Sequence, residues 1–379
     1  MNTGPKPEKR RWPAGGISLG ASSLAAVVSL MAIAVGPAAA IASAPPGPRL
    51  ATVELIQTKG SEWEENASSP FVALTTFGAS GQKARHLLKA RLDEGKGLRP
   101  FPFFGPAWTG DGRAIAFLGS KGKSTSVYAI GADGEQLQRL GGVTGPVFSS
   151  DGKAMAFSTS HSHHRHPGQP ESRDYSSTAT WVADLGTGKA RRLTAWRNGL
   201  SNVPTSFSPD GSVLALTRDD DNVDGQQVVL AHVDGSGSTT LFPHASEAVI
   251  SPDGTQIAFA GYLNPTVIEA EENRDYEIGE LYVANIDGTG VKRLTKNDDG
   301  IETSPSWDPS SERLAYVQMK ASTSFDPALD FLFPFGNEVR EMNADGSCKK
   351  TVRRSPELAF YGVMWEPGEG RAAGRIACR

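Results

Sequence analysis

SFSPDGSVLAL (residues 206–216) joins an apolar strand end to a second apolar strand through a tight polar turn, and this unit decides the fold. It recurs along the chain as AWTGDGRAIAF from Ala107, VFSSDGKAMAF from Val147, VISPDGTQIAF from Val249, SWDPSSERLAY from Ser306 and MWEPGEGRAAGRIAC from Met364. A unit that returns at intervals of roughly 40 to 60 residues is typical of propellers and related repeat architectures.

A second unit follows the first in most repeats. Its clearest copy is LYVANIDGTGVKRLT from Leu281, and it recurs as VYAIGADGEQLQRL from Val127, WVADLGTGKARRLT from Trp181, VVLAHVDGSGSTTL from Val228 and VREMNADGSCKKTV from Val339. Asp-Gly and Gly-rich turns between β-branched and aromatic runs are typical of hairpins, because glycine adopts positive φ at little steric cost. No long segment sustains a helical period, so we predict an all-β chain of two-hairpin repeats.

The two ends of the chain complete each other in this pattern. The last copy of the first unit, Met364–Cys378, reaches the C-terminus without a second unit after it. FVALTTFGASGQKARHLL, residues 71–88, matches the missing second unit. We therefore predict a six-bladed β-propeller closed by N-terminal strands that complete the C-terminal blade, with one hairpin from each end. Such closure leaves no open sheet edge around the ring.

These repeats resemble the TolB-type six-bladed β-propeller family, whose unit is similar to SPDG and IAF followed by LYV, DG and RLT. The resemblance covers roughly residues 50 to 379 and is strongest in repeats three and four. It departs at Ser310–Ser311 and Gly368–Glu369, where Asp-Gly is expected. The resemblance implies the fold, the envelope compartment and a protein-binding role. The TolB family also carries a separate N-terminal α/β domain, which we expect this chain to lack.

The first forty residues have the composition of a secretory signal peptide. Basic residues Lys6, Lys9, Arg10 and Arg11 precede an apolar stretch, and Ala38–Ala40 offers small residues for cleavage. We predict a signal peptide over 1–40, a linker over 41–50 and the propeller over 51–379. The alternative is an uncleaved N-terminal anchor, although the apolar run from Leu24 to Val35 is short for a membrane span.

The predicted localisation is therefore secreted, periplasmic or in the cell envelope, with no membrane span after cleavage. Cleavage would remove more positive than negative charges and leave the mature chain more acidic than the formal net charge of −4. An acidic protein repels the phosphate backbone, so we predict no nucleic-acid partner. Export would permit a disulfide bond between Cys348 and Cys378, the two cysteines of the chain. Two separate thiols are the alternative.

The histidine-rich insertion of repeat two is a candidate for metal binding. It carries His161, His163, His164 and His166 within a polar loop. Neutral imidazole binds transition metals, either adventitiously or in a catalytic centre. Four histidines so close together lack the separated ligands of a preorganised site, so a solvated polar loop is the alternative.

Repeat three carries DDDNVDG, in which Asp220, Asn222 and Asp224 alternate as oxygen donors before Gly225. Calcium takes hard oxygen ligands at such spacings, and glycine permits the sharp turn. The twelfth position of an EF-hand loop would be Ala231 rather than glutamate. The two remaining interpretations are a propeller-type calcium clip and an ordinary acidic turn.

Two aromatic segments lie in long connections between strands. They contain Phe325, Phe331, Phe333 and Phe335 in repeat five, and Phe101, Phe103 and Phe104 before repeat one. So much apolar surface either folds over the channel mouth or forms a docking patch for a protein or an envelope component.

The sequence holds no G-x-S-x-G elbow, Walker loop or H-E-x-x-H motif. The chain also ends where the α/β-hydrolase domain of a propeller peptidase would begin, so we expect no such peptidase. We predict an exported, non-enzymatic scaffold that binds a protein or envelope ligand through its long loops and requires no cofactor. The alternative is a metal-dependent lyase or lactonase-type hydrolase that uses the central channel.

Overall fold

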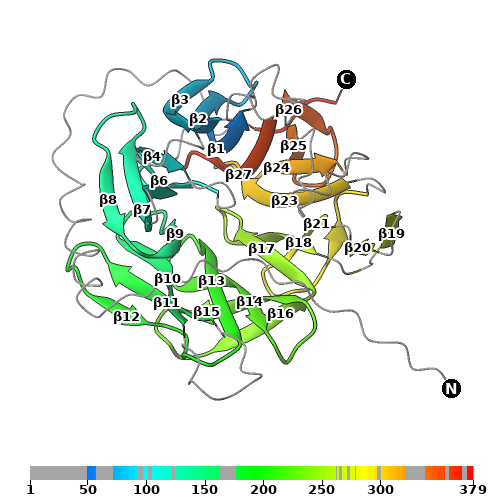
Figure 1. Cartoon of the computed structure of the whole chain (residues 1–379). Coiled ribbons are helices and arrows are strands. Elements are labelled where there is room, and N and C mark those ends of the chain that lie inside the picture. Colours follow the sequence, from blue (N-terminus) through cyan, green and yellow to red (C-terminus); the bar gives the residue numbers. More distant parts are fainter. Residues whose placement is uncertain are drawn as a thin grey trace.

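The computed structural model describes most of the repeat region as β-strands. The described residues are 49–56, 71–91, 97–100, 105–121, 124–162, 176–261, 263, 267–270, 274–277, 279–296, 300–320, 338–354, 358–368 and 374–378. Six antiparallel sheets stand around a common axis as the blades of a propeller (Figure 1). The predicted all-β, six-bladed fold is confirmed. No helix long and apolar enough to span a membrane occurs among these residues.

The strands of each blade follow one another from the innermost strand outward. Blade one contains β4 (Leu98–Pro100) and β5 (Ala107–Trp108), which both pair with β6 (Ala114–Lys121), then β7 (Ser124–Gly131) and β8 (Gln138–Gly141). Blade two contains β9 (Thr144–Phe148), β10 (Ala154–Ser162), β11 (Ser176–Asp184) and β12 (Ala190–Arg192). Blade three contains β13 (Leu200–Phe207), β14 (Val213–Asp220), β15 (Gln226–His232) and β16 (Ser238–Pro243).

The second half of the ring follows the same order. Blade four contains β17 (Ala245–Ile250), β18 (Gln256–Gly261), β21 (Glu280–Asn285) and β22 (Lys292–Arg293), with an inserted hairpin of β19 (Val267–Ala270) and β20 (Arg274–Glu277). Blade five contains β23 (Gly300–Trp307), β24 (Arg313–Lys320), β25 (Glu338–Asn343) and β26 (Lys350–Arg354). Blade six contains β27 (Leu358–Trp365), β1 (Arg49–Ile56), β2 (Phe71–Gly78) and β3 (Arg85–Arg91).

The ring closes in blade six, where N-terminal strands complete the C-terminal blade as predicted, although the C-terminal side gives one strand and not a hairpin. β1 pairs with β27 on one side and with β2 on the other, so three strands come from the N-terminal side and one from the C-terminal side. Residues 374–378, predicted as the second strand, form no strand. The segment RLATVELI is longer and pairs along its whole length with β2. Ile376 instead donates its backbone N–H to Asn343 Oδ1 of blade five at 2.7 Å.

A buried ion pair joins the two ends of the chain. Arg49 at the start of β1 donates from Nε and a terminal amino group to the two carboxylate oxygens of Glu366, at 2.8 and 2.6 Å. The guanidinium also lies 5.1 Å from the ring centre of Trp108, whose Nε1 donates to the Met364 carbonyl at 3.2 Å. Blade one is thus fastened to both strands of the closure.

The hydrophobic core is divided among the contacts between neighbouring blades. Six clusters of buried apolar side chains each join two adjacent blades. Between blades three and four, for example, Phe259 stacks on Phe242 and Tyr282, with ring centres 4.3 and 5.5 Å away. Because the apolar residues of each strand face the next blade, the ring buries them without a central hydrophobic core.

The SPDG turns fasten one side of the ring. In blade three, Ser208 Oγ donates to Asp210 Oδ1 at 2.6 Å, and the Ser212 N–H donates to the same oxygen at 3.0 Å. Blade five keeps this turn with the two residue types exchanged, because Ser310 Oγ donates to Asp308 Oδ2 at 2.7 Å. Asp308 Oδ1 also accepts the Arg313 N–H at 3.0 Å. The departure from Asp-Gly at Ser310–Ser311 therefore preserves the hairpin.

Candidate functional site

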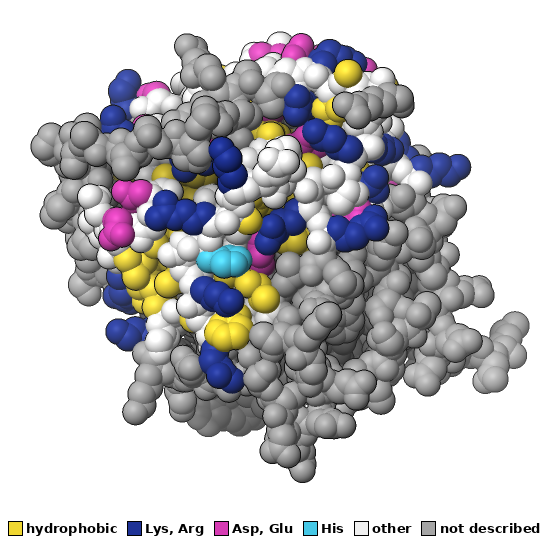
Figure 2. Space-filling model, turned by 90° about the horizontal axis from the view of Figure 1, so that it is seen from above, with side chains coloured by type: hydrophobic (Ala, Val, Ile, Leu, Met, Phe, Trp, Pro, Cys, Tyr) yellow, Lys and Arg dark blue, Asp and Glu magenta, His cyan; other side chains and the backbone are white. Residues whose placement is uncertain are grey.

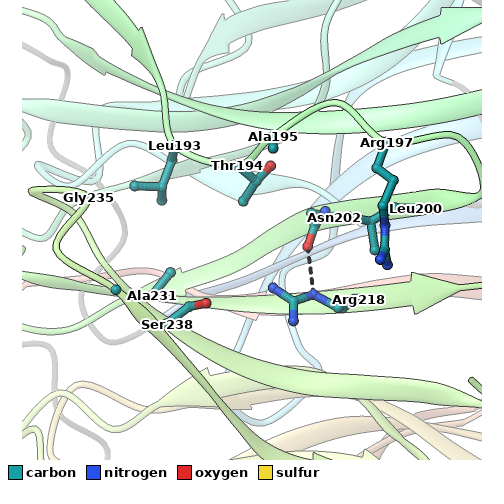
Figure 3. Close-up of a pocket in the computed structure, with 11 residues that line it drawn as sticks. Leu193, Thr194, Ala195, Arg197, Leu200, Asn202, Arg218, Ala231, Gly235 and Ser238 are labelled. Carbon is teal, nitrogen blue, oxygen red and sulfur yellow. Dashed lines mark hydrogen bonds between the residues drawn. The ribbon is translucent and has the colours of Figure 1, made fainter.

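A cavity of about 460 Å³ lies between blades two and three (Figure 3). Its floor comes from β13, β14 and β15, and its walls come from the connection after β12 and the turn between β15 and β16. Its lining residues are Leu193, Thr194, Ala195, Arg197, Leu200, Asn202, Arg218, Ala231, Gly235, Gly237 and Ser238. A volume of this size accommodates a small organic ligand.

Asn202 is held rigidly at this cavity by the neighbouring blade. Its backbone N–H donates to Thr178 Oγ1 at 2.9 Å, and its carbonyl accepts from Ser158 Oγ at 2.8 Å and Thr180 Oγ1 at 3.0 Å. The residue has no solvent-exposed surface. Three hydroxyl groups of blade two thus fix a polar residue of the innermost strand of blade three.

Arg218 orients the side-chain amide of Asn202. Its Nε donates to Asn202 Oδ1 at 3.0 Å, the bond drawn in Figure 3. A guanidinium can only donate, so the amide oxygen must face it and Nδ2 must point elsewhere. Among the described residues, Asn202 Nδ2 has no hydrogen-bond partner. A buried donor without a partner is costly, which makes this amide a marker for a ligand or an ordered water.

The charge of Arg218 is only partly compensated. Burial lowers the pKa of its guanidinium, Asp220 raises it, and Arg197 lowers it further. Burial is the largest of these effects, because it removes the water that would solvate the cation. An anion in the cavity would restore the missing stabilisation.

Asp220, the first predicted calcium ligand, forms an ion pair with Arg197 at the edge of this cavity. It also accepts the backbone N–H of Asn222 at 3.1 Å and the side-chain Nδ2 at 3.0 Å. The Asn222 backbone bond is the main reason that the pKa of Asp220 is lowered. Asp224 is exposed in the turn between β14 and β15. Arg197 thus provides the cationic partner of Asp220 in this structure, and the calcium clip stays a prediction.

The remaining predicted site residues are largely beyond the described part of the chain. Outside it lie Phe101, Phe103, Phe104, Phe325, Phe331, Phe333, Phe335, His163, His164 and His166. The backbone of His161 ends β10 opposite Ser177. Within the described ranges, no group of three or more His, Cys, Asp or Glu side chains is arranged to hold a metal ion. The transition-metal and aromatic-patch hypotheses stay predictions.

Cys348 and Cys378 form a disulfide bond, with Cα atoms 4.9 Å apart. The bond ties the last described residues to the turn between β25 and β26. Asp345 of the same turn forms an ion pair with Arg375 at 2.5 Å, so the C-terminal segment packs on blade five.

A second polar cluster lies between blades four and five. Glu302 of β23 is fully buried and accepts from Gln318 Nε2 at 2.8 Å. Burial, followed by repulsion from Glu280, raises the pKa of Glu302 to about 7. Glu280 accepts from Thr295 Oγ1 at 2.7 Å and pairs with Arg293. The cluster therefore holds one carboxyl group that changes its charge near neutral pH.

The outer edge of blade six is basic despite the acidic composition of the chain. Figure 2 shows Lys and Arg side chains gathered over the described part of this side, with few acidic ones. β3 of blade six carries Arg85, Lys89 and Arg91, and β26 of the neighbouring blade five contributes Arg353 and Arg354. Part of this charge is neutralised, since Arg353 Nε lies 3.0 Å from buried Glu54. Basic side chains on an outermost strand also discourage pairing with another sheet edge.

Sequence reasoning did not identify Asn202 and Arg218 as site residues. Both lie within strands of the best-matching repeats, where polar residues fit the alternating pattern of a half-buried strand. The position of Asn202 inside a strand was one signal, because asparagine is depleted in strand interiors. Asn202 is held in its buried position by hydroxyl groups of another blade. The sequence does not reveal that these residues are in contact.

The cavity side chains support binding rather than proton transfer. Arg197, Arg218 and Asn202 provide hydrogen-bond donors, while Leu193, Leu200 and two alanines give apolar walls. No carboxylate, imidazole or thiol belongs to the described lining.

No protein-family model matches the chain. Dipeptidyl-peptidase 5 from Porphyromonas gingivalis is 23% identical over 226 residues, which cover 57% of this chain. The match spans only 30% of that protein's length.

Among solved structures, TolB from Acinetobacter baumannii has a TM-score of 0.56 and 18% identity, covering 85% of this chain and 67% of its own. A putative TolB from Agrobacterium tumefaciens has a TM-score of 0.52 and 16% identity, covering 85% of this chain and 99% of its own. The chain thus has the six-bladed β-propeller fold of the TolB structures.

Proposed function

We propose that this chain is an exported β-propeller that acts as a non-enzymatic binding scaffold for a protein or ligand in the cell envelope or outside the cell. The composition of residues 1–40 supports export, and the likeness to TolB structures supports a role in the envelope. The fold alone does not define a partner. The two faces of the ring support the binding role.

The two faces of the propeller differ in their connections. In blades one to five, the turns from first to second strand and from third to fourth strand emerge on one side, which we call the turn face. These turns are short and closed by Asp, Ser and Thr side chains, such as Asp210 and Asp287. Because neighbouring strands are antiparallel, the connections from second to third strand emerge on the opposite side, which we call the long-loop face.

The observation that carries the proposal is the placement of the long insertions. Those of blades two, four and five join the second strand to the third, and the described strands that flank them end and begin at the long-loop face. They run from β10 to β11, from β18 to β21 and from β24 to β25. A rigid ring that carries its variable loops on one side is the arrangement that binding proteins use.

Metal content separates this proposal from a metal-dependent lyase or lactonase. The mature protein, exhaustively desalted, is subjected to elemental analysis beside a His163→Ala/His164→Ala variant. We expect only trace transition metal in both proteins, because closely spaced loop histidines do not make a preorganised centre. Stoichiometric transition metal in wild type that disappears in the variant would contradict the proposal. Retained calcium alone is consistent with a structural clip at Asp220 and leaves the binding role in place.

A further inference from the structure

We propose that the cavity between blades two and three is a binding site for a small monoanionic carboxylate with an apolar body. The inference does not depend on the partner or on the long-loop face, because it concerns a small molecule and the purified protein. It rests on the unpartnered amide of Asn202, the guanidinium of Arg218, the net charge of the lining and the shape of the cavity.

The donor geometry suits a planar anion. Asn202 Nδ2 has no partner among the described residues, and its direction is fixed because Oδ1 accepts from Arg218 Nε at 3.0 Å. The side chain of Arg218 borders the cavity, and its two terminal amino groups are further donors. The guanidinium fork offers parallel donors, the arrangement that a carboxylate accepts, and the amide N–H₂ of Asn202 is a further donor that points away from Arg218.

The net charge of the cavity lining favours a ligand with one negative charge. Arg197 and Arg218 are the charged side chains of the described lining. Asp220 forms an ion pair with Arg197 and also acts on Arg218, so these three groups carry one net positive charge. A monoanion would balance this charge, whereas a dianion would leave an excess negative charge in a half-buried site.

The rest of the cavity selects the body of the ligand. Leu193, Ala195, Leu200 and Ala231 present apolar side chains, and Gly235 and Gly237 leave the turn side free of side chains. These surfaces provide a place for a small ring or a branched alkyl group, which gains free energy by leaving water. The chemical class is therefore an organic acid rather than an inorganic oxyanion.

The test uses benzoate as the probe and benzamide as its neutral counterpart. Binding to the mature protein is followed through the side-chain N–H₂ signals of Asn202 in a nitrogen-15 NMR spectrum and through the thermal melting temperature. We expect benzoate to shift the Asn202 signals and raise the melting temperature, with benzamide at least about tenfold weaker. Equal binding of both probes, or no shift with benzoate, would overturn the proposal.

Two variants and a control locate the interaction. Arg218→Met and Asn202→Asp each remove a donor and are expected to lower benzoate affinity at least about tenfold. If Arg218→Met does not fold, Arg218→Lys keeps the charge, loses the fork of donors and should still bind more weakly. Arg113→Met, at an exposed turn of blade one, should bind benzoate like wild type. Unchanged affinity in the cavity variants, or sulfate binding more tightly than benzoate, would contradict a carboxylate site.

Discussion

An Ala51→Pro variant is expected to lose at least about 3 kcal/mol of unfolding free energy, because it removes a backbone donor and places a ring inside a paired strand. Ala51 is fully buried in β1 and lies opposite Thr76 of β2 and Met364 of β27. In a strand with partners on both sides, each backbone N–H faces a neighbouring strand and not solvent. Proline is therefore not tolerated there. Urea unfolding of the mature protein measures the loss.

Ala51→Gly is the matched control for this variant. Glycine keeps the N–H donor and removes one methyl group, so its cost should be only about 1 kcal/mol. If Ala51→Pro unfolds at the same urea concentration as Ala51→Gly, then β1 is not the strand that closes the ring. The pairing of β27 would then have to come from elsewhere in the chain.

A Glu302→Gln variant is expected to be more stable than wild type above neutral pH. Burial and Glu280 raise the pKa of Glu302 from 4.5 to about 7, so the folded state keeps a proton that the unfolded state releases. The stability that this proton provides is present below pH 4.5 and is lost as pH rises to about 7. The cumulative loss in wild type is roughly 3 kcal/mol, since each unit of pKa difference is worth about 1.4 kcal/mol. Glutamine carries no charge at any pH, so the variant should not lose this unfolding free energy as pH rises.

The measurement is the difference in unfolding free energy between wild type and Glu302→Gln across pH 4 to 8. We expect the two curves to meet at the acidic end and to separate in favour of the variant as pH rises. Glu312→Gln, at an exposed turn of the same blade, is the control for the loss of one negative charge and should parallel wild type. A constant difference between wild type and Glu302→Gln would show that Glu302 does not change its charge in this range.

The repeats predicted the architecture because each one carries its own turn chemistry. Asp210 and Asp253 stand in SPDG sequences whose hydrogen bonds are local, so the number of blades follows from the sequence alone. The details of closure depend on competition between distant segments. The last residues of the chain were predicted as a strand, whereas RLATVELI takes that position by pairing with β2 and β27.

The candidate site could not be found in this way. The cavity forms where blade three meets blade two, and its decisive features are the buried state of Asn202 and its contact with Arg218. These residues are sixteen positions apart and belong to neighbouring strands. The sequence drew attention instead to DDDNVDG, where Asp220 proves to neutralise Arg197 beside the cavity. Composition marks dense clusters of one residue type, whereas a binding site is made by single residues from several strands.

Site-specific cross-linking tests the proposed binding role most directly. A photoreactive residue replaces Val223, in the turn from β14 to β15 on the long-loop face, or Val291, in the turn from β21 to β22 on the turn face. Both side chains are similarly exposed, at 39% and 44%, which makes them a matched pair. In the native host, we predict a discrete covalent adduct from position 223 and none from position 291. Adducts from position 291 alone, or equally from both positions, would contradict a scaffold that binds its partner through the long-loop face.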